Sequence, residues 1–534
     1  MHNINKITLA MVFGLAFSAH GQEATTEQAD TSAQTEATED ELGLEVISVT
    51  ATKRKTKLME TPVAISALSE AQLKQNGVNN VKDIANLVPG LDISTATDQS
   101  APVISMRGVR STNITELGDP AVGVHLDGVY SPRMQGALAL MYDVDRVEAL
   151  RGPQGTLFGR NSTVGSINVI SAKPKFEATY GGVNVEAGKY NSRVIDGFVN
   201  VPLSDDFAIR VAAKGLQRDS YLEGYYDPNQ YDTRWLSDEV LSAPVISEDS
   251  YQGIGSTVTQ RENWWIDAAG TDPEAQKVRA LTPASKDNFY NNADEYSFRI
   301  STLWAPLDGN FSNHTVFQQY VNRSGGNIDL VNCDKLRGRP AEYGGDCNNL
   351  LPSDNTYQAV VNVPGELNLD ITYLRNTLNY NLNDELSVVW LLGYEDMERS
   401  SQQDSEIGLD PWDGAIYFLD GTGATSYSTE LQLQSDEYGD LIWIAGVNYF
   451  HEKTTTLGYY DNAMDDKAFW DQPDRSTDAL AVFGQATYNL SKDLHLTLGY
   501  RYSDETKQDV ACTGAFAAHH TLFQTSQFRC FQYK

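Results

Sequence analysis

The sequence is poor in basic residues, in cysteine and in long apolar runs. Only 40 of its 534 residues are Lys or Arg, against 72 Asp and Glu, which gives a formal net charge of −32. Nucleic-acid binding depends on Lys and Arg side chains that neutralise phosphates, so this balance argues against a nucleic-acid partner. Beyond the N-terminal segment, no stretch is long and apolar enough for a membrane-spanning helix, which takes about 20 residues. Any membrane-spanning part must therefore be built from strands.

The four cysteines form two local pairs, Cys333 with Cys347 and Cys512 with Cys530. In an exported protein, an even number of closely spaced cysteines is typical of loop disulfides. His519 and His520 lie between the second pair, so a zinc site is the alternative, but the spacing matches no standard zinc pattern. We therefore expect two disulfides, no metal site and no cofactor.

The N-terminal region has the features of an export signal followed by a linker. In residues 1–22, Lys6 supplies a basic start, an apolar core follows, and residues 19–21 form a small-x-small cleavage site. The apolar run is too short for an uncleaved anchor. Residues 23–44 are acidic and almost free of apolar side chains, which predicts a disordered linker.

A compact α+β domain is expected over residues 52–175. Ser69 occupies a cap position before a helical pattern at 70–75, and a second helical pattern over 81–88 stops at Pro89-Gly90. Short strand-like runs follow at 103–107, 122–126, 144–150 and 167–170. A stretch of about 130 residues is enough for one small core.

From residue 176 onward, apolar and polar side chains alternate with a period of two. In one run, Phe207 and Ile209 share a face while Arg210 lies on the other. About eleven such runs, each of roughly ten residues, are typical of an antiparallel transmembrane β-barrel, although a soluble β-sandwich also alternates. The runs lie near 180–190, 193–203, 206–217, 295–305, 311–323, 369–382, 385–398, 427–435, 440–452, 480–490 and 493–505.

The connections between these runs alternate between short and long. Short turns lie at 203–206, 306–310, 382–384, 435–440 and 490–493, and long connections at about 218–293, 324–368, 399–426, 453–479 and 506 onward. Outer-membrane barrels have short periplasmic turns and long extracellular loops, and a sandwich has no reason to keep this rhythm. The pattern therefore favours a membrane all-β barrel, with both cysteine pairs in outward loops.

A Gly-rich segment from Arg151 to Asn161 precedes the apolar strand at 167–170. Taken alone, it is also compatible with any Gly-rich loop between two strands. Its turn-forming residues are Gly152, Pro153, Gly155, Gly159 and Asn161. Together with the motifs at 107–110 and 124–130 and the strand motifs at 430–434, 446–450 and 482–488, it makes the chain resemble a TonB-dependent outer-membrane receptor.

The resemblance covers the chain from the linker to its last residue. It implies an α+β plug, residues 52–175, inside a barrel of about 22 strands whose N-terminal half is residues 176–534. The family's barrel needs about as many strands again, and its members finish on a strand with an aromatic last residue, whereas this chain stops at Lys534. We therefore expect a fragment or a truncated product that does not form a working transporter by itself. Because the linker is short, we expect no additional N-terminal signalling domain.

Residues 45–51 match the family's TonB box, which comprises Glu45, Val46, Ile47, Ser48, Val49, Thr50 and Ala51. Their β-branched side chains have high β-propensity. An exposed extended segment behind a disordered linker can pair edge-on with a sheet in another protein. The resemblance implies that this partner is TonB, with its inner-membrane energising complex pulling on the plug. The alternative is that the segment is simply the plug's first strand.

A plug inside a large barrel must be held by polar contacts that can be broken. The candidates on the plug are Arg107, Arg110, Arg151 and Arg160. Glu430 is the candidate on the wall, because it alternates with lipid-facing Leu431 and Leu433. A guanidinium–carboxylate pair of this kind contributes about 1.5–3 kcal/mol. Solvated charges in the lumen are the alternative.

The connection at 218–293 is rich in aromatic residues that could capture a ligand. The candidates are Tyr225, Tyr226, Trp235, Trp264 and Trp265. Aromatic side chains also occur in membrane-interface belts and in ordinary loop packing. The family favours a ferric siderophore, with an oligosaccharide or another scarce nutrient as the alternative.

Functions of other classes fit less well. The sequence has no G-x-S-x-G, H-E-x-x-H or P-loop pattern, so no enzyme is expected. A passive porin or a structural adhesin would leave the plug motifs unused. We expect a protein surrounded by outer-membrane lipid, with the plug and TonB box facing the periplasm and the long loops outside the cell.

Overall fold

A computed structural model describes residues 47–95, 102–111, 118–135, 141–226, 282–306, 309–328, 357–361, 364–404, 416–436, 440–462, 466–491, 494–517 and 529–533. The chain divides into residues 1–46 and 47–534, and all described residues belong to the second unit. No helix in this described part is long and apolar enough to cross a membrane.

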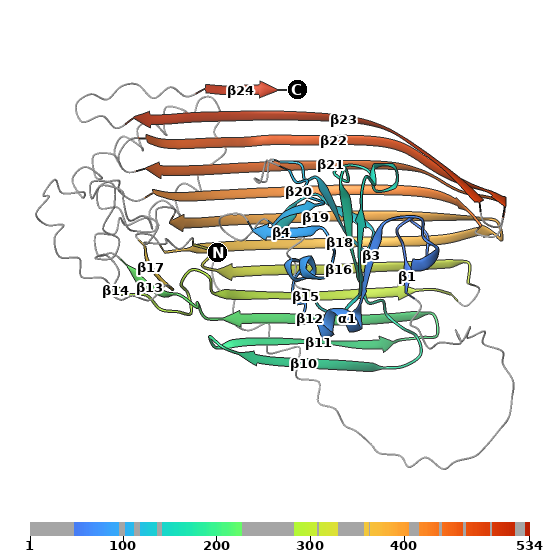
Figure 1. The fold of residues 1–534 in the computed structure, drawn as a ribbon, viewed down its shortest axis with the longest axis horizontal. Coiled ribbons are helices and arrows are strands. Elements are labelled where there is room, and N and C mark those ends of the chain that lie inside the picture. The colour runs from blue at the N-terminus through green and yellow to red at the C-terminus, as the bar shows by residue number, and fades with distance from the viewer. Residues whose placement is uncertain are drawn as a thin grey trace, which may run out of the picture. The chain divides into compact units, whose positions relative to one another are not determined.

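The largest element is a 12-stranded antiparallel sheet in which neighbours along the chain are neighbours in space (Figure 1). Its strands are β10 (Tyr180–Gly188), β11 (Ser192–Pro202), β12 (Phe207–Arg218), β15 (Ala293–Trp304), β16 (Phe311–Ser324), β18 (Glu366–Asn383), β19 (Leu386–Asp404), β20 (Ile416–Ser435), β21 (Leu441–Asn462), β22 (Asp466–Ser491), β23 (Leu494–Ala517) and β24 (Arg529–Tyr533). The eleven strands expected from the alternating pattern are confirmed. The sequence analysis missed β24, which is short and pairs with the end of β23.

The two faces of this sheet have opposite chemistry. On β12, Arg210 and Lys214 are buried on the inner face, which carries polar and charged side chains on most strands. The outer face carries exposed apolar side chains, such as Leu496, Leu498 and Tyr500 on β23, which are 49%, 68% and 72% exposed. A soluble protein buries its apolar face, so this inversion is what an outward, lipid-facing surface requires.

Several strands are longer than the sequence analysis predicted. β19 continues to Asp404, β20 begins at Ile416, and β21 and β22 leave only residues 463–465 between them. The long connections predicted at 399–426 and 453–479 are therefore wrong in extent. These strand extensions lack the lipid-facing alternation on which the prediction rested, but their main chains still pair.

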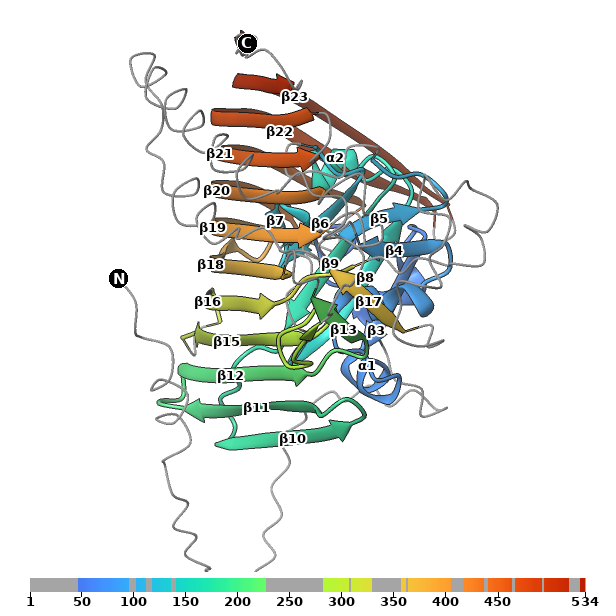
Figure 2. The ribbon, with the colours of Figure 1, turned by 90° about the vertical axis from the view of Figure 1, so that its left-hand side faces the viewer.

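A small domain lies against the inner face of the sheet (Figure 2). Its five-stranded sheet has the order β3 (Ile65–Ser69), β8 (Val144–Arg151), β9 (Gly165–Ser171), β6 (Val122–Leu126) and β7 (Val129–Ser131). Two hairpins complete it: β1 (Ser48–Val49) with β2 (Thr56–Lys57), and β4 (Leu91–Thr95) with β5 (Pro102–Met106).

Two helices of the small domain each begin with a capping box, and the first lies at the predicted cap Ser69. Ser69 forms a capping box with Gln72 at the start of α1 (Glu70–Gln75). Asn80 and Asp83 form a second box at the start of residues Val81–Asn86, which adopt a 3-10 helix. The apolar side chains of both helices pack into one core with the five-stranded sheet.

Candidate functional site at the plug–wall interface

The described part of the predicted TonB box, residues 47–51, is docked, although the sequence analysis expected it to be exposed. β1 pairs with β2, and Val49 and Ala51 are 0% and 1% exposed. The main-chain N–H of Thr50 donates to Glu148 Oε1 at 2.8 Å, and the Thr50 hydroxyl contacts both Glu148 oxygens. Exposure is therefore the wrong expectation for these residues, because their apolar side chains have a core to enter. Glu45 and Val46 lie outside the described residues.

The Gly-rich motif supplies part of that core. After β8, Gly152 and Gly159 adopt positive φ angles of 101° and 78°, which turn the chain into the short helix α2 (Gly155–Phe158) and out again. Leu157 and Phe158 of α2 are buried against Val49 and against wall residues on β21 and β22. The motif therefore forms part of the apolar surface against which the box segment packs. Gly155 lies within α2, Pro153 is exposed, and Asn161 donates to the Tyr130 hydroxyl at 2.7 Å.

Glutamates of four wall strands contact the plug, and we call them the acidic wall: Glu395 on β19, Glu430 on β20, Glu452 on β21 and Glu505 on β23. Lys53 pairs with Glu430 at 3.2 Å, and both side chains are about nine-tenths buried. Arg133 makes a two-pronged contact with Glu452, with Nε donating to Oε1 at 2.6 Å. Ser131 Oγ donates to Glu395 at 2.7 Å, and Arg160 pairs with Glu505 at 3.2 Å.

The neighbouring strands present the opposite charge, and we call their cations the basic wall: Arg210 and Lys214 on β12, Arg299 on β15 and Arg375 on β18. Asp143 of the plug pairs with both Arg210 and Arg299, and the three side chains are 3–5% exposed. Arg375 lies 3.4 Å from Asp127, at the tip of the β6–β7 hairpin. Lys214 donates to the Asn79 side chain at 2.6 Å and to the main chain of Met141.

The plug therefore meets two walls of opposite charge. Among the described plug–wall ion pairs, the exception is Lys507 of β23 with Asp119 of the plug. The sequence analysis singled out Arg160 and Glu430 but missed the basic wall, Arg133 and Glu452. The inward position of Arg210 in the alternating pattern was the available signal, but no sequence feature pointed to Asp143 as its partner.

The other predicted plug arginines lie elsewhere. Arg107 and Arg110 are exposed, and Arg151 is partly buried. Within the described residues, none of the three makes an ion pair with the wall. A role for them in holding the plug stays a prediction.

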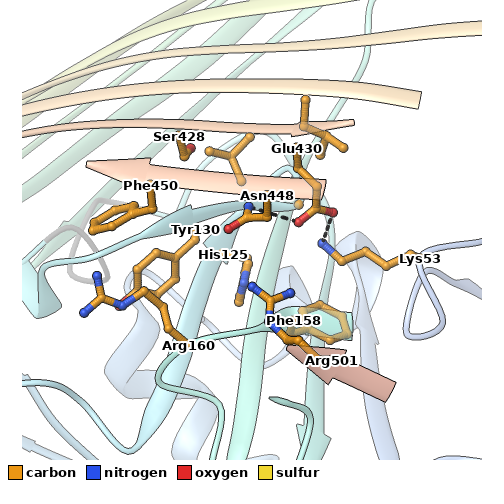
Figure 3. Close-up of a pocket in the computed structure, with 13 residues that line it drawn as sticks. Lys53, His125, Tyr130, Phe158, Arg160, Ser428, Glu430, Asn448, Phe450 and Arg501 are labelled. Carbon is orange, nitrogen blue, oxygen red and sulfur yellow. Dashed lines mark hydrogen bonds and ion pairs between the residues drawn. The ribbon is translucent and has the colours of Figure 1, made fainter. Parts of the chain in front are cut away.

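A small cavity of about 30 Å³ lies between the β6–β7 hairpin and strands β19–β21 (Figure 3). Its lining combines Lys53 and Arg160 of the plug with Glu430 and Arg501 of the wall. His125 lies beside it, 1% exposed, and burial lowers its pKa to about 3, helped by the charge of Lys53. This histidine is therefore neutral at physiological pH.

The predicted ligand and disulfide residues are only partly described. Tyr225 and Tyr226 lie on β13 (Glu223–Tyr226), which joins β14 (Thr282–Pro283) and β17 (Gln358–Val361) in a three-stranded sheet. Trp235, Trp264, Trp265, Cys333 and Cys347 lie outside the described residues. Cys512 and Cys530 are direct register partners on β23 and β24, so their main chains are placed for a cross-strand bond. Both disulfides stay predictions.

Two family descriptions match the chain. Residues 57–166 match the "TonB-dependent Receptor Plug Domain", and residues 286–528 match the "TonB dependent receptor-like, beta-barrel". The chain is 25% identical over 488 residues to the pesticin receptor of Yersinia enterocolitica, covering 87% of this chain and 63% of that protein. It is 28% identical over 186 residues to the ferrioxamine B receptor of Salmonella typhimurium, covering 33% of this chain and 25% of that protein.

Solved structures share the fold. The ferric yersiniabactin uptake receptor of Yersinia pestis superposes with a TM-score of 0.62 at 16% identity, over 88% of this chain and 60% of that one. The ferripyoverdine receptor of Pseudomonas aeruginosa superposes with a TM-score of 0.57 at 15% identity, over 90% of this chain and 56% of that one. The chain thus spans less than two thirds of the length of these relatives.

Proposed function

Because this chain belongs to the TonB-dependent receptor family, we propose that it serves the energy-dependent uptake of a ferric siderophore across the bacterial outer membrane. The observation that carries the proposal is the docked box segment beside a plug held by buried ion pairs. A passive pore would need neither a box segment nor a plug. Relatives named for ferrioxamine B and ferripyoverdine support an iron chelate as cargo.

The proposed orientation follows from the two rims of the sheet. Residues 47–51 lie beside the wall ends that carry the short turns, because Arg54 donates to the carbonyl oxygen of Ser435 at 2.7 Å. Short turns face the periplasm in outer-membrane barrels. The box would then face TonB, and the long connections would face the cargo outside the cell.

The box segment must leave its docked position before TonB can pair with it. Pairing uses the main-chain edge of residues that now contact β2 and Glu148. A pull on this segment would load the Lys53–Glu430 pair and the Arg54 contacts next, because both residues directly follow the box. The plug contacts along the two walls resist the pull after that.

Uptake of ⁵⁵Fe-labelled siderophores by iron-starved cells tests this function. We expect uptake that depends on the receptor and stops when TonB is deleted, with surface binding retained. Val49→Pro removes an amide donor from the added strand and should abolish uptake without weakening surface binding. Val49→Ala, which keeps the donor, is the matched control. Uptake that is equal in Val49→Pro and wild-type cells would refute the role of residues 45–51.

An oligosaccharide or another scarce nutrient is the second candidate cargo. The number of aromatic residues in the sequence at 218–293, which includes Tyr225, supports it. Growth on each nutrient in a receptor-deleted strain separates the two. Planar-bilayer conductance addresses the porin alternative: a plugged receptor stays nearly closed, and steady conductance would contradict the proposal.

A further inference from the structure

Two glycines of the wall face the plug, Gly393 on β19 and Gly499 on β23. Each is the middle residue of a Leu-Gly-Tyr triplet, at 392–394 and 498–500. Successive residues of a strand point to opposite faces, so a triplet whose Leu and Tyr lie on the outer face has its glycine on the inner face. Glycine inside a strand weakens the strand and often marks a place where another part of the protein approaches closely.

The space at Gly393 is filled by Val129, which lies in the β6–β7 hairpin of the plug. A Cβ atom at Gly393 would overlap Val129 Cγ1 and would lie 2.6 Å from Ser428 Oγ. Val129 is 7% exposed, although it lies near the tip of a hairpin. We call this recess, formed by Gly393 and its register partner Ser428, the β19 socket. Only glycine at position 393 lets the Val129 side chain enter it.

A second recess at Gly499, which we call the β23 socket, receives Thr156 of α2. A Cβ atom at Gly499 would lie 2.9 Å from Thr156 Cγ2, which is closer than side-chain carbons pack. Val129 and Thr156 belong to different elements of the plug, β7 and α2. The two sockets therefore hold the plug at two separate points of the wall.

Beside the β19 socket the wall projects toward the plug. Phe450 on β21 is 2% exposed, and the ring of Tyr130 meets it edge-on at 5.7 Å (Figure 3). The Arg160 guanidinium lies over the same ring at 4.6 Å. Ser428 is the register partner of Gly393 on one side and of Phe450 on the other. Recess and projection thus alternate along one cross-strand row, and a shifted plug would no longer match them.

We propose that Gly393 and Gly499 are positioning residues whose sockets fix the closed position of the plug, and so keep the pore shut until the box segment is pulled. The ion pairs of the two walls attract the plug, but this attraction changes gradually with distance. Overlap of packed atoms rises steeply, so the sockets define the position more sharply. The inference rests on the proposed role of the plug in closing a transport pore, and it adds the residues that set the closed position.

The test fills each socket and then makes room on the plug. Gly393→Ala is compared with Gly393→Ala/Val129→Ala, and Gly499→Ala with Gly499→Ala/Thr156→Ser. Serine at position 156 removes the Cγ2 methyl that meets Gly499 and keeps the hydroxyl. Gly215→Ala on β12 is the matched control, because a Cβ atom there meets nothing within 4 Å.

The readout is the conductance of the full-length protein in planar bilayers, without cargo and without TonB. We expect each single glycine variant to conduct about ten-fold more than wild type, because an extra methyl in a packed contact shifts an equilibrium by about that factor. Each paired variant and the Gly215→Ala control should stay within two-fold of wild type. If a single variant does not fold, its paired variant must restore both folding and closure for the proposal to stand.

Wild-type conductance in both single glycine variants would overturn the sockets while leaving the uptake function intact. Paired variants that leak as much as the single variants would also overturn them. Steady conductance of the wild-type protein would instead contradict the plugged-receptor function. The sockets would then be judged by native-state proteolysis of the plug, which we expect to be faster in the single variants and restored in the paired ones. Equal rates of proteolysis in all variants would overturn the sockets.

Discussion

The basic wall and the acidic wall hold the same plug in different ways. On the basic wall, one plug carboxylate, Asp143, is shared by Arg210 and Arg299, and all three groups are almost fully buried. On the acidic wall, Lys53 and Arg133 each meet their own glutamate. Removing Asp143 therefore disrupts two ion pairs with the basic wall, whereas removing Lys53 or Arg133 disrupts one ion pair with the acidic wall.

This difference predicts which wall loses its contacts with the plug first. The box segment leads directly into Lys53, so a pull reaches the acidic wall before the basic wall. The opposite charges also define one orientation of the plug, because a rotated plug would bring Asp143 toward the acidic wall. We expect the basic wall to act as the anchor and the acidic wall as the side that opens.

The largest expected loss of stability comes from a substitution at Asp143, which pairs with the basic wall. Asp143→Asn removes the charge that two buried guanidinium groups share, and it should lower the free energy of unfolding by about 3–5 kcal/mol. Asparagine also tolerates the positive φ of 49° at this position, so the loss reports the charge. Urea titration in detergent measures it. The control is Asp145→Asn, where the side chain is 54% exposed, and a loss of similar size there would contradict the account.

The two predicted disulfides test whether the loops contribute to stability in addition to the plug–wall ion pairs. Replacing Cys512 and Cys530 with Ser should lower stability by about 3 kcal/mol, the chain-entropy value for a loop of this size. The plug should stay attached, because the pair lies on β23 and β24 and not on a plug contact. Non-reducing peptide mapping should recover Cys512–Cys530 and Cys333–Cys347. Free thiols at these positions, or zinc bound near His519 and His520, would contradict the pairing.

Glu452→Gln should have a smaller effect than Asp143→Asn. It keeps the shape of the side chain but removes the charge that faces Arg133, at a loss of about 1.5–3 kcal/mol. Proteolysis of the plug under native conditions measures the change, with the exposed Glu398→Gln on β19 as control. If this substitution released the plug more readily than Asp143→Asn, the assignment of anchor and opening side would be reversed.

The smallest effect concerns pH. The pKa of His125 is about 3 in the folded plug, because burial and the nearby charge of Lys53 disfavour the cation, and about 6.5 in the unfolded chain. Between these values the unfolded state binds the proton, so stability falls as pH decreases below 6.5, by about 2 kcal/mol at pH 5. His125→Gln should remove this slope. If the dependence of stability on pH were unchanged in His125→Gln, other titratable groups would be its cause.

The strands of the sheet were predictable because each must present apolar side chains outward at every second position, as Leu496 and Leu498 do. The cap at Ser69 was predictable because it depends on neighbouring residues only, whereas the sequence analysis did not name Asn80, which caps Val81–Asn86 in the same way. The extension of β20 toward Ile416 was not predictable, because residues 416–426 do not alternate between apolar and polar side chains and their main-chain pairing needs no such pattern.

The plug–wall contacts were beyond local inference. Arg133 and Glu452 are 319 positions apart, and only the folded sheet brings them together. The inward position of Arg210 could be read from alternation, but its partner Asp143 sits in a turn with no motif. The docking of Val49 was missed for a related reason, since its burial depends on Leu157 and Phe158 more than a hundred positions away.

The most direct measurement of the two-wall arrangement is a charge swap at Lys53 and Glu430, followed by native-state proteolysis of the plug in the full-length protein. Lys53→Glu and Glu430→Lys should each speed release, because each puts like charges together in a buried site whose native pair is 3.2 Å apart. The double swap restores an attractive pair and should return release close to the wild-type rate. If the increases in release rate caused by the two single substitutions simply added up in the double variant, the account would be contradicted.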